Sequence, residues 1–237
     1  GGSVTAANVG PYALAAGDTL IVDTDAISPT TATFTATAAT RATTPDGPFD
    51  LANNDTLTVK INQGAVQTIT FVTGDFSNID AATAAEVADK INDVIVGAKA
   101  SVNGAKVQII SDRLGTGSYV EVTGGTSNTA LQFSTAEIQG TGNVSDVKAV
   151  TVAEVKTVVE AAVTGVTVTN VSGAARITRN TTGTGATVQV DASSSADDEL
   201  GFDNAVHAGS AGGVVDTLQI TGKTDGTYAH QFKSRVE

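Results

Sequence analysis

Residues 10 to 23 read GPYALAAGDTLIVD, and residues 47 to 60 read GPFDLANNDTLTVK. Eight of the fourteen positions are identical, and the second stretch starts 37 residues after the first. The match continues as far as Phe34 and Phe71 at the same offset. Apolar and polar residues alternate from 57 to 62, which is the period-2 pattern of a half-buried strand. The sequence therefore predicts one β-hairpin that occurs twice.

A second duplication relates residues 80 to 133 to residues 148 to 202, at an offset of 68 that slips to 69 near the end. TAAEVADKIN in the first copy corresponds to TVAEVKTVVE in the second, and each copy opens with Thr-x-x-Glu. This spacing is typical of a capping box, in which hydroxyl and carboxylate satisfy free amides of the first helical turn. The capping-box pairs are Thr83 with Glu86 and Thr151 with Glu154.

Apolar residues recur at helical spacing behind each cap, so each helix is expected to lay one narrow face on a sheet. The expected faces are Val87, Ile91 and Val94 in the first copy, and Val155, Val159 and Ala162 in the second. Further on, Asn103-Gly104 favours a two-residue hairpin turn. The unit from 55 to 133 thus has the expected order β-β-α-β-β-β.

The two duplications do not coincide. No helix directly follows the first hairpin in the sequence, and no hairpin directly precedes the second helix. The economical explanation is nesting, with pairing between residues 18 to 35 and residues 166 to 190. We predict an α+β fold of two homologous small ββαβββ modules, mostly antiparallel sheet with one helix each, one nested in the other. The predicted divisions are a discontinuous module at 10–37 plus 144–206, an inserted module at 47–135 and the start of a further domain at 214–237.

The composition excludes several classes of protein. Net charge is −12 with acidic residues spread along the chain, whereas nucleic-acid binding needs a concentrated basic face. The longest apolar runs fall far short of the roughly 20 residues that span a bilayer, and cysteine is absent, so no disulfide or thiolate metal site can form. We expect neither a nucleic-acid nor a membrane partner. Because Met is absent and the final AHQFKSRVE stops within an apparent strand, we expect a processed chain or a segment of a larger one.

Histidine, serine and glycine motifs give no catalytic pattern. His207 and His230 lack a partner at ligand or triad spacing. Ser210 lies among glycines but misses the nucleophile-elbow pattern, which favours a linker at 210 to 213. The GTG triplets at 115–117 and 183–185 open no helix and precede no Lys-Ser/Thr, so we interpret them as turns between strands.

Two acidic clusters are candidate calcium sites, because Ca²⁺ binds carboxylate oxygens. Neither matches the spacing of a known loop, and acidic clusters are mostly solvated surface. The clusters are Asp197, Asp198, Glu199 and Asp203, and Asp23 with Asp25. We therefore predict no catalytic, cofactor-binding or metal site and no cofactor.

The stretch from 55 to 123 resembles the flagellin and hook IN motif. That motif joins a hairpin to a helix ending near Ile-Asn, and to a strand pair ending in a Ser-x-x-x-Gly turn. The matching residues are Ile91, Asn92, Ser111 and Gly115. The second copy departs from the motif, with Val159-Glu160 at the Ile-Asn position and Arg179 in place of the serine. Together the two copies cover about half the chain.

The tandem Ala/Thr/Gly-rich modules with TAAEV helices also resemble variable, surface-facing domains of tailed-phage virion proteins. TLQITGKTDGTYAHQF, near the C-terminus, resembles the strand-turn-strand segment of contractile tail sheath subunits, where TAK-x-x-G-x-x-G-N is usual. Gly222, Lys223 and Gly226 fit that pattern, while Ala229 and His230 replace its Gly-Asn.

These resemblances imply a structural subunit of a phage particle (tail sheath, tail or capsid decoration) and not an enzyme. Its outer modules would be exposed on a symmetric assembly, and its partners would be copies of itself and other virion proteins. One alternative is the outer domain of a flagellar filament or hook-associated protein, which predicts long heptad-bearing helices that this segment does not show. The other is an adhesin at the bacterial cell surface or an enzyme, which predicts a pocket with clustered aromatics or paired carboxylates; three Tyr and no Trp argue against a sugar platform.

Overall fold

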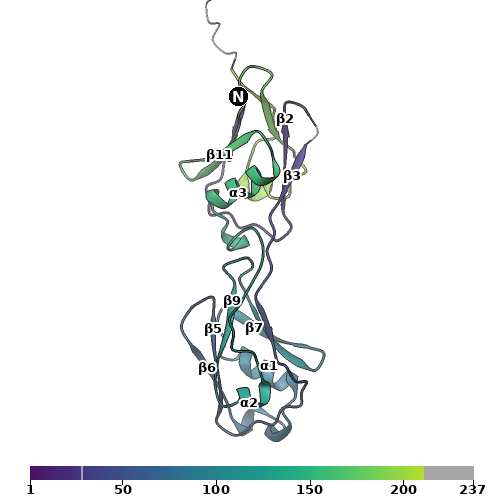
Figure 1. Cartoon of the computed structure of the whole chain (residues 1–237), viewed down its shortest axis with the longest axis vertical. Helices are drawn as coiled ribbons and strands as arrows, with labels where there is room; N and C mark the ends of the chain where they lie inside the picture. Colours follow the sequence, from purple (N-terminus) through teal and green to yellow (C-terminus); the bar gives the residue numbers. More distant parts are fainter. Residues whose placement is uncertain (28, 211–237) are drawn as a thin grey trace, which may run out of the picture.

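Four small sheets, all with antiparallel pairing, and four short α-helices make up the part of the chain that the structure describes, residues 1–27 and 29–210 of a computed structural model (Figure 1). The fold is α+β, as predicted. The further domain expected at 214–237, with Gly222, Lys223, Gly226, Ala229 and His230, lies outside the described residues.

The strands are β1 (Ser3–Thr5), β2 (Thr19–Thr24), β3 (Thr30–Thr33), β4 (Thr40–Ala42), β5 (Asp55–Ile61), β6 (Gln67–Phe71), β7 (Ala98–Asn103), β8 (Lys106–Ser111), β9 (Tyr119–Gly124), β10 (Ile138–Gln139), β11 (Val166–Val171), β12 (Ala174–Arg179), β13 (Thr187–Val190) and β14 (His207–Ala208). The helices are α1 (Ala84–Asn92), α2 (Asn128–Leu131), α3 (Val152–Ala162) and α4 (Asp197–Leu200), with 3₁₀ turns η1 (Thr73–Asp75), η2 (Ile79–Ala81) and η3 (Val147–Ala149).

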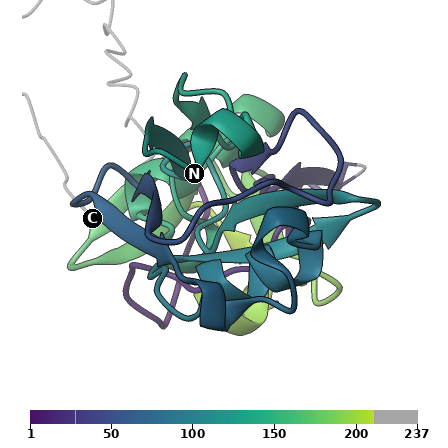
Figure 2. The same ribbon diagram turned by 90° about the horizontal axis from the view of Figure 1, so that it is seen from below.

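Buried apolar side chains form two separate cores. One core contains residues from Val4 to Ala36 and from Val144 to Phe202, and the other contains residues from Ala39 to Phe133. We call residues 1–36 with 143–210 the first body and residues 37–142 the second body. The two bodies are stacked along the long axis (Figure 1), and the second lies in front of the first when seen from below (Figure 2).

Each body holds two sheets. The first body has the strand orders β1-β12-β11 and β14-β13-β2-β3, and the second has β4-β8-β7 and β10-β9-β5-β6. The pairing expected between residues 18 to 35 and 166 to 190 is present, because β2 lies beside β13 with Val22 opposite Val190. The order β5-β6-α1-β7-β8-β9 is the β-β-α-β-β-β order expected for residues 55 to 133.

Three features of the elements differ from the sequence prediction. Strands β1 and β4 pair with β12 and β8, but each has only three residues and shows too little alternation to be recognised. The helices α2 and α4 were not predicted either, because each has only four residues, too few to show a helical repeat. The assignment of Val94 to the buried face of α1 was wrong: the helix ends at Asn92, Val94 is 39% exposed, and Ile95 is buried instead.

The capping boxes explain where the two longer helices begin. Thr83 Oγ1 accepts a hydrogen bond from the Glu86 amide at 3.2 Å, and Glu86 Oε2 accepts from the Thr83 amide at 2.9 Å. Glu86 Oε1 also accepts from the Ser77 amide at 2.8 Å, so one carboxylate ties the helix to the preceding loop. Glu154 makes the corresponding bonds to the amides of Thr151 at 2.8 Å and Ser145 at 2.7 Å. The amides at the start of a helix have no backbone partner within it, which is why a side-chain acceptor stabilises the helix start.

We expect Glu86→Gln to destabilise the second body at neutral pH and to have little effect in strong acid. The hydrogen bonds from Ser77 and Thr83 lower the pKa of Glu86 to about 2, from an ordinary value of 4.5. A lowered folded-state pKa stabilises the protein above the unfolded value, and the contribution is lost as the pH falls towards 2. Urea unfolding at pH 7 and near pH 2 checks this, with Glu137→Gln in an exposed loop as the control. An equal loss of stability at both pH values would contradict the expectation.

Candidate functional site

His207 has an acidic neighbour that the sequence analysis did not anticipate. Its Nε2 lies 2.6 Å from Asp203 Oδ1, four residues earlier, and this contact is the main cause that lowers the pKa of Asp203. Ser210 is an exposed residue just beyond β14. His230 lies outside the described residues.

The acidic cluster at 197 to 203 is used to shape a turn. Asp197 Oδ1 accepts from the Phe202 amide at 2.8 Å, and its Oδ2 accepts from Asn204 Nδ2 at 3.0 Å. Asp198 and Glu199 are exposed on α4. Within residues 1–27 and 29–210, no three His, Cys, Asp or Glu side chains come together as a metal site would require.

Asp25 holds together three strands of the first body. It follows β2, and its Oδ2 accepts from Nη2 and Nε of Arg179 at 2.8 and 3.0 Å, while its Oδ1 accepts from the Thr187 amide at 2.9 Å. The hydrogen bond from Arg179 is the main cause that lowers the pKa of Asp25. Asp23, the other residue of this candidate cluster, has a buried Oδ1 with no hydrogen-bond partner among the described residues.

An uncharged version of this arrangement occurs in the second body. Asn62 follows β5, and its Oδ1 accepts from Ser111 Oγ at 2.9 Å and from the Tyr119 amide at 3.0 Å. Asp25 and Asn62 share a left-handed backbone conformation, with φ of 58° and 51°. Asp25 thus contacts Arg179 and the Thr187 amide in the first body in the way that Asn62 contacts Ser111 and the Tyr119 amide in the second.

We expect Asp25→Asn to destabilise the first body at neutral pH, because Arg179, whose side chain is 14% exposed, would lose its anionic partner. The lowered folded-state pKa of Asp25 means that this contribution is present above the unfolded value of 3.8 and lost at lower pH. The double variant Asp25→Asn with Arg179→Ser reproduces the Asn62–Ser111 pair and should recover part of the loss. Urea unfolding of Asp25→Asn, Arg179→Ser and the double variant tests this, and a double variant whose loss of stability equals the sum of the two single losses would contradict it.

The two GTG triplets lie in turns between strands, as predicted: 115–117 joins β8 to β9, and 183–185 joins β12 to β13. The first triplet also contacts the first body. The Thr116 amide donates to the Val144 carbonyl at 2.9 Å, and the Gly117 amide donates to the Ser145 carbonyl at 2.8 Å. Gly115 has φ of +126°, and a side chain there would overlap the Val144 carbonyl oxygen.

The chain crosses between the bodies beside this triplet, at residues 35–39 and 139–143. The two crossings are paired, with Ala36 opposite Gly142 and a 2.7 Å bond from the Thr37 amide to the Thr141 carbonyl. Arg113 Nε lies 3.3 Å from Asp146 Oδ2 across the same region. We call residues 35–39, 113–118 and 139–147 the waist, and it is a joint built from backbone hydrogen bonds.

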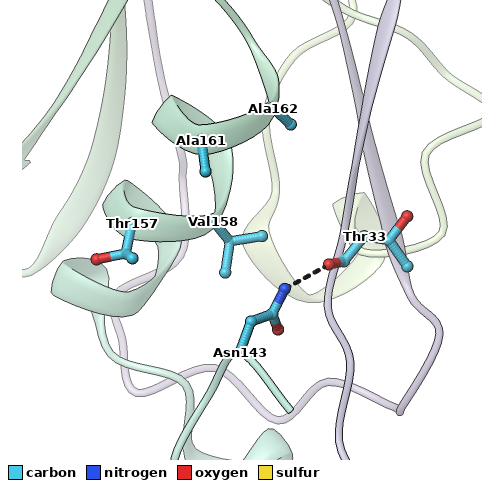
Figure 3. A pocket seen from close by; sticks show the side chains of 6 residues that line it. All are labelled: Thr33, Asn143, Thr157, Val158, Ala161 and Ala162. Atoms are coloured by element: carbon cyan, nitrogen blue, oxygen red, sulfur yellow. Dashed lines mark hydrogen bonds between the residues drawn. The ribbon is translucent and has the colours of Figure 1, made fainter.

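A shallow groove of 260 Å³ lies between β3 and α3 on the first body (Figure 3). Its lining is small and uncharged: Thr33, Asn143, Thr157, Val158, Ala161 and Ala162. Asn143 Nδ2 donates to the Thr33 carbonyl at 2.8 Å along one wall. A groove without a titratable side chain offers a shape but no group for acid–base chemistry.

The sequence analysis missed the waist and the Asp25–Arg179 pair. The two offsets of the sequence duplications could have revealed the pair. The offset of 37 residues aligns Asp25 with Asn62, and the offset of 68 residues aligns Arg179 with Ser111. Nothing in the sequence signals the waist contacts, since backbone groups make most of them.

No protein-family model matches this chain, and a search of curated proteins finds no similar sequence. In the part of the chain that the structure covers, no helix is both long enough and apolar enough to cross a membrane.

Proposed function

We propose that the two bodies are copies of one ββαβββ module, the one at 47–135 inserted into the one at 10–37 plus 144–206. Recurring contacts support this. Asn128 Oδ1 accepts from the Phe133 amide at 2.9 Å after α2, as Asp197 accepts from Phe202 after α4. The Asn62 and Asp25 arrangements and the two capping-box glutamates are further corresponding pairs. Removing the inserted module and joining residue 37 to residue 142 through two glycines should leave a folded first body.

We propose further that the chain is a structural subunit of a phage particle, in a tail sheath, a tail or a capsid decoration. The observation that carries this proposal is the waist, a hydrogen-bonded joint that stacks two bodies along one axis. Such a joint suits a part that projects from an assembly and must keep its shape. The phage assignment itself rests on the resemblance of the modules to surface-facing virion domains, because fold alone does not determine function.

Four carboxylates that could have taken part in chemistry have structural roles. Glu86 and Glu154 cap helices, Asp197 closes a turn, and Asp25 neutralises Arg179. The net charge of −12 gives an acidic exterior that resists non-specific association. A mechanical subunit of this kind would have copies of itself and other virion proteins as partners, and would be located in the phage particle.

The second body would lie outermost. The first body meets the waist at one end and carries Gly1 and Gly209 side by side at the other, where a side chain on Gly209 would lie 3.0 Å from the Gly1 Cα. The described chain therefore starts and ends on the far side of the first body from the second (Figure 1). If that end attaches to the particle, the second body is the part most distant from it.

The second candidate is an outer domain of a flagellar filament or hook-associated protein. It is favoured by the geometry of the IN-like segment, where Ile91 is buried and Asn92 fixes the start of β7. Asn92 Oδ1 accepts from the Ala100 amide at 2.7 Å, and its Nδ2 donates to the Ala100 carbonyl at 3.0 Å.

Sedimentation and negative-stain microscopy of the native material that contains this chain test the proposal. We expect the chain to sediment with large particles that show rings or a capsid lattice. Co-sedimentation with long filaments that carry no head would support the flagellar candidate. Dispersed monomers would contradict both.

A further inference from the structure

The shallow groove on the first body lies beside an edge strand. Among the described residues, β3 is the last strand of the sheet β14-β13-β2-β3. Just after β3, the Phe34 amide donates to the Asp18 carbonyl and the Phe34 carbonyl accepts from the Gly17 amide, both at 2.8 Å. Backbone groups alternate between the two sides of a strand, so those of Thr31 and Thr33 point away from β2, to the side where the groove lies.

A neighbouring chain segment already lies on this side of the strand, one residue further along. The Asn143 amide donates to the Thr35 carbonyl at 3.0 Å, and Asn143 Oδ1 accepts from the Thr35 amide at 2.8 Å. Gly142 pairs with Ala36 in an antiparallel bridge. The place beside the strand is therefore occupied as far as Asn143, and the groove continues it past the Thr33 carbonyl (Figure 3).

The other wall of the groove is an uncharged face of α3. Val158 points across the groove towards β3 (Figure 3) and is only 5% exposed, whereas Ala161 is exposed to solvent. The volume of 260 Å³ is below the roughly 300–1,000 Å³ of typical small-molecule sites. The groove therefore suits a small side chain of an extended peptide better than a cofactor.

The second body carries a charged pair in the similar position between β6 and α1. The Asp75 amide donates to the Val72 carbonyl at 2.9 Å and its Oδ2 accepts from the Val72 amide at 3.0 Å, which are the bonds that Asn143 makes to Thr35. Lys90 Nζ lies 3.0 Å from the same Oδ2. Charged side chains beside an edge strand discourage its pairing with another chain. The lining of the first-body groove has no such charge.

We propose that the groove is a docking site for an extended, uncharged segment of another protein chain. The segment pairs with β3 beyond Asn143 and bonds to the outward backbone groups of Thr31 and Thr33, while one small apolar side chain packs on Val158 and Ala161. The net charge of −12 disfavours an acidic segment, and a basic one finds no opposite charge in the lining. The inference uses only the geometry of the first body, so it holds for a phage particle or a flagellar filament.

A peptide with blocked ends and the sequence TTVTT is the probe, because threonine and valine favour extended backbone. It is titrated into the full chain, and the amide resonances of the protein are followed. We expect saturable shifts at Thr31, Thr33, Asn143 and Ala161. The peptide TTDTT should bind at least about tenfold more weakly, because it places a charge against an apolar wall. Shifts that do not saturate, or equal affinities of the two peptides, would overturn the proposal.

One substitution at the groove has a matched control on the other body. Ala161→Lys introduces a charged side chain beside β3, and Ala85→Lys makes the same change at an exposed position of α1. We expect Ala161→Lys to weaken binding of TTVTT at least about tenfold and Ala85→Lys to leave it unchanged. Equal binding by the two variants would place the peptide elsewhere and would contradict the assignment of the groove.

Hydrogen exchange of the unsubstituted chain gives a measurement that does not depend on a variant folding. We expect the amides of Thr31 and Thr33 to exchange rapidly in the free chain and at least about tenfold more slowly at saturating TTVTT. Slow exchange before the peptide is added would mean that the chain itself fills the place beside β3, and the proposal would be wrong. Rapid exchange that the peptide does not change would also overturn it.

Discussion

Replacing Phe71 by alanine lowers the stability of the second body by about 3–5 kcal/mol and leaves that of the first body nearly unchanged. Phe71 is fully buried, and it belongs to the core that runs from Ala39 to Phe133. The loss combines the transfer free energy of the ring with the cost of the cavity that it leaves. Because the two cores share no side chain, the cavity is confined to one of them.

Phe34→Ala is the matched variant, since Phe34 is fully buried in the first core and lies 37 residues before Phe71. We expect it to destabilise the first body by a similar amount. Urea unfolding followed by amide resonances of each body separates the two effects. If either variant lowered the midpoints of both bodies equally, the two cores would be one cooperative unit and the account of separate bodies would be wrong.

Gly115→Ala is expected to be far more damaging than Gly183→Ala, although each glycine begins a GTG turn between two strands. Both have positive φ, +126° and +107°, so an alanine at either position costs about 1–3 kcal/mol of backbone strain. Only at Gly115 does the added carbon also overlap the Val144 and Ser145 carbonyls, and the backbone of the waist must move to relieve it. We expect a total of about 4 kcal/mol or more for Gly115→Ala.

The measurement is the free energy of unfolding of both variants, together with the amide resonances of Thr116 and Gly117. Loss of their hydrogen bonds to the first body should appear only in Gly115→Ala. Equal destabilisation by the two substitutions would mean that strain alone is responsible and that the waist contributes nothing.

Much of the fold was predictable because local signals agreed with each other. The alternation from Leu57 to Asn62 and the Thr-x-x-Glu caps at Thr83 and Thr151 each report on a few neighbouring residues, and the structure contains those hairpins and helices. The pairing of β2 with β13 joins residues far apart in the chain, and the mismatch between the two duplications was the only signal for it.

The rest depended on contacts that a linear pattern does not encode. Val94 follows the helical spacing but lies beyond the last helical residue, so the periodicity was extended too far. His207 acquires Asp203 as a neighbour through the turn that follows α4. At the waist the GTG triplet acts through its amides, and the same three letters at 183–185 make no such bonds among the described residues.

The most direct test of the central claim is a cryo-electron microscopy reconstruction of the native assembly at a resolution that distinguishes the two bodies. We predict many symmetry-related copies of a two-lobed projection, with the first body towards the particle and the second body at its outer end. An assembly that contains this chain without symmetry, or one in which the second body is buried against the particle and the first projects outward, would contradict the account.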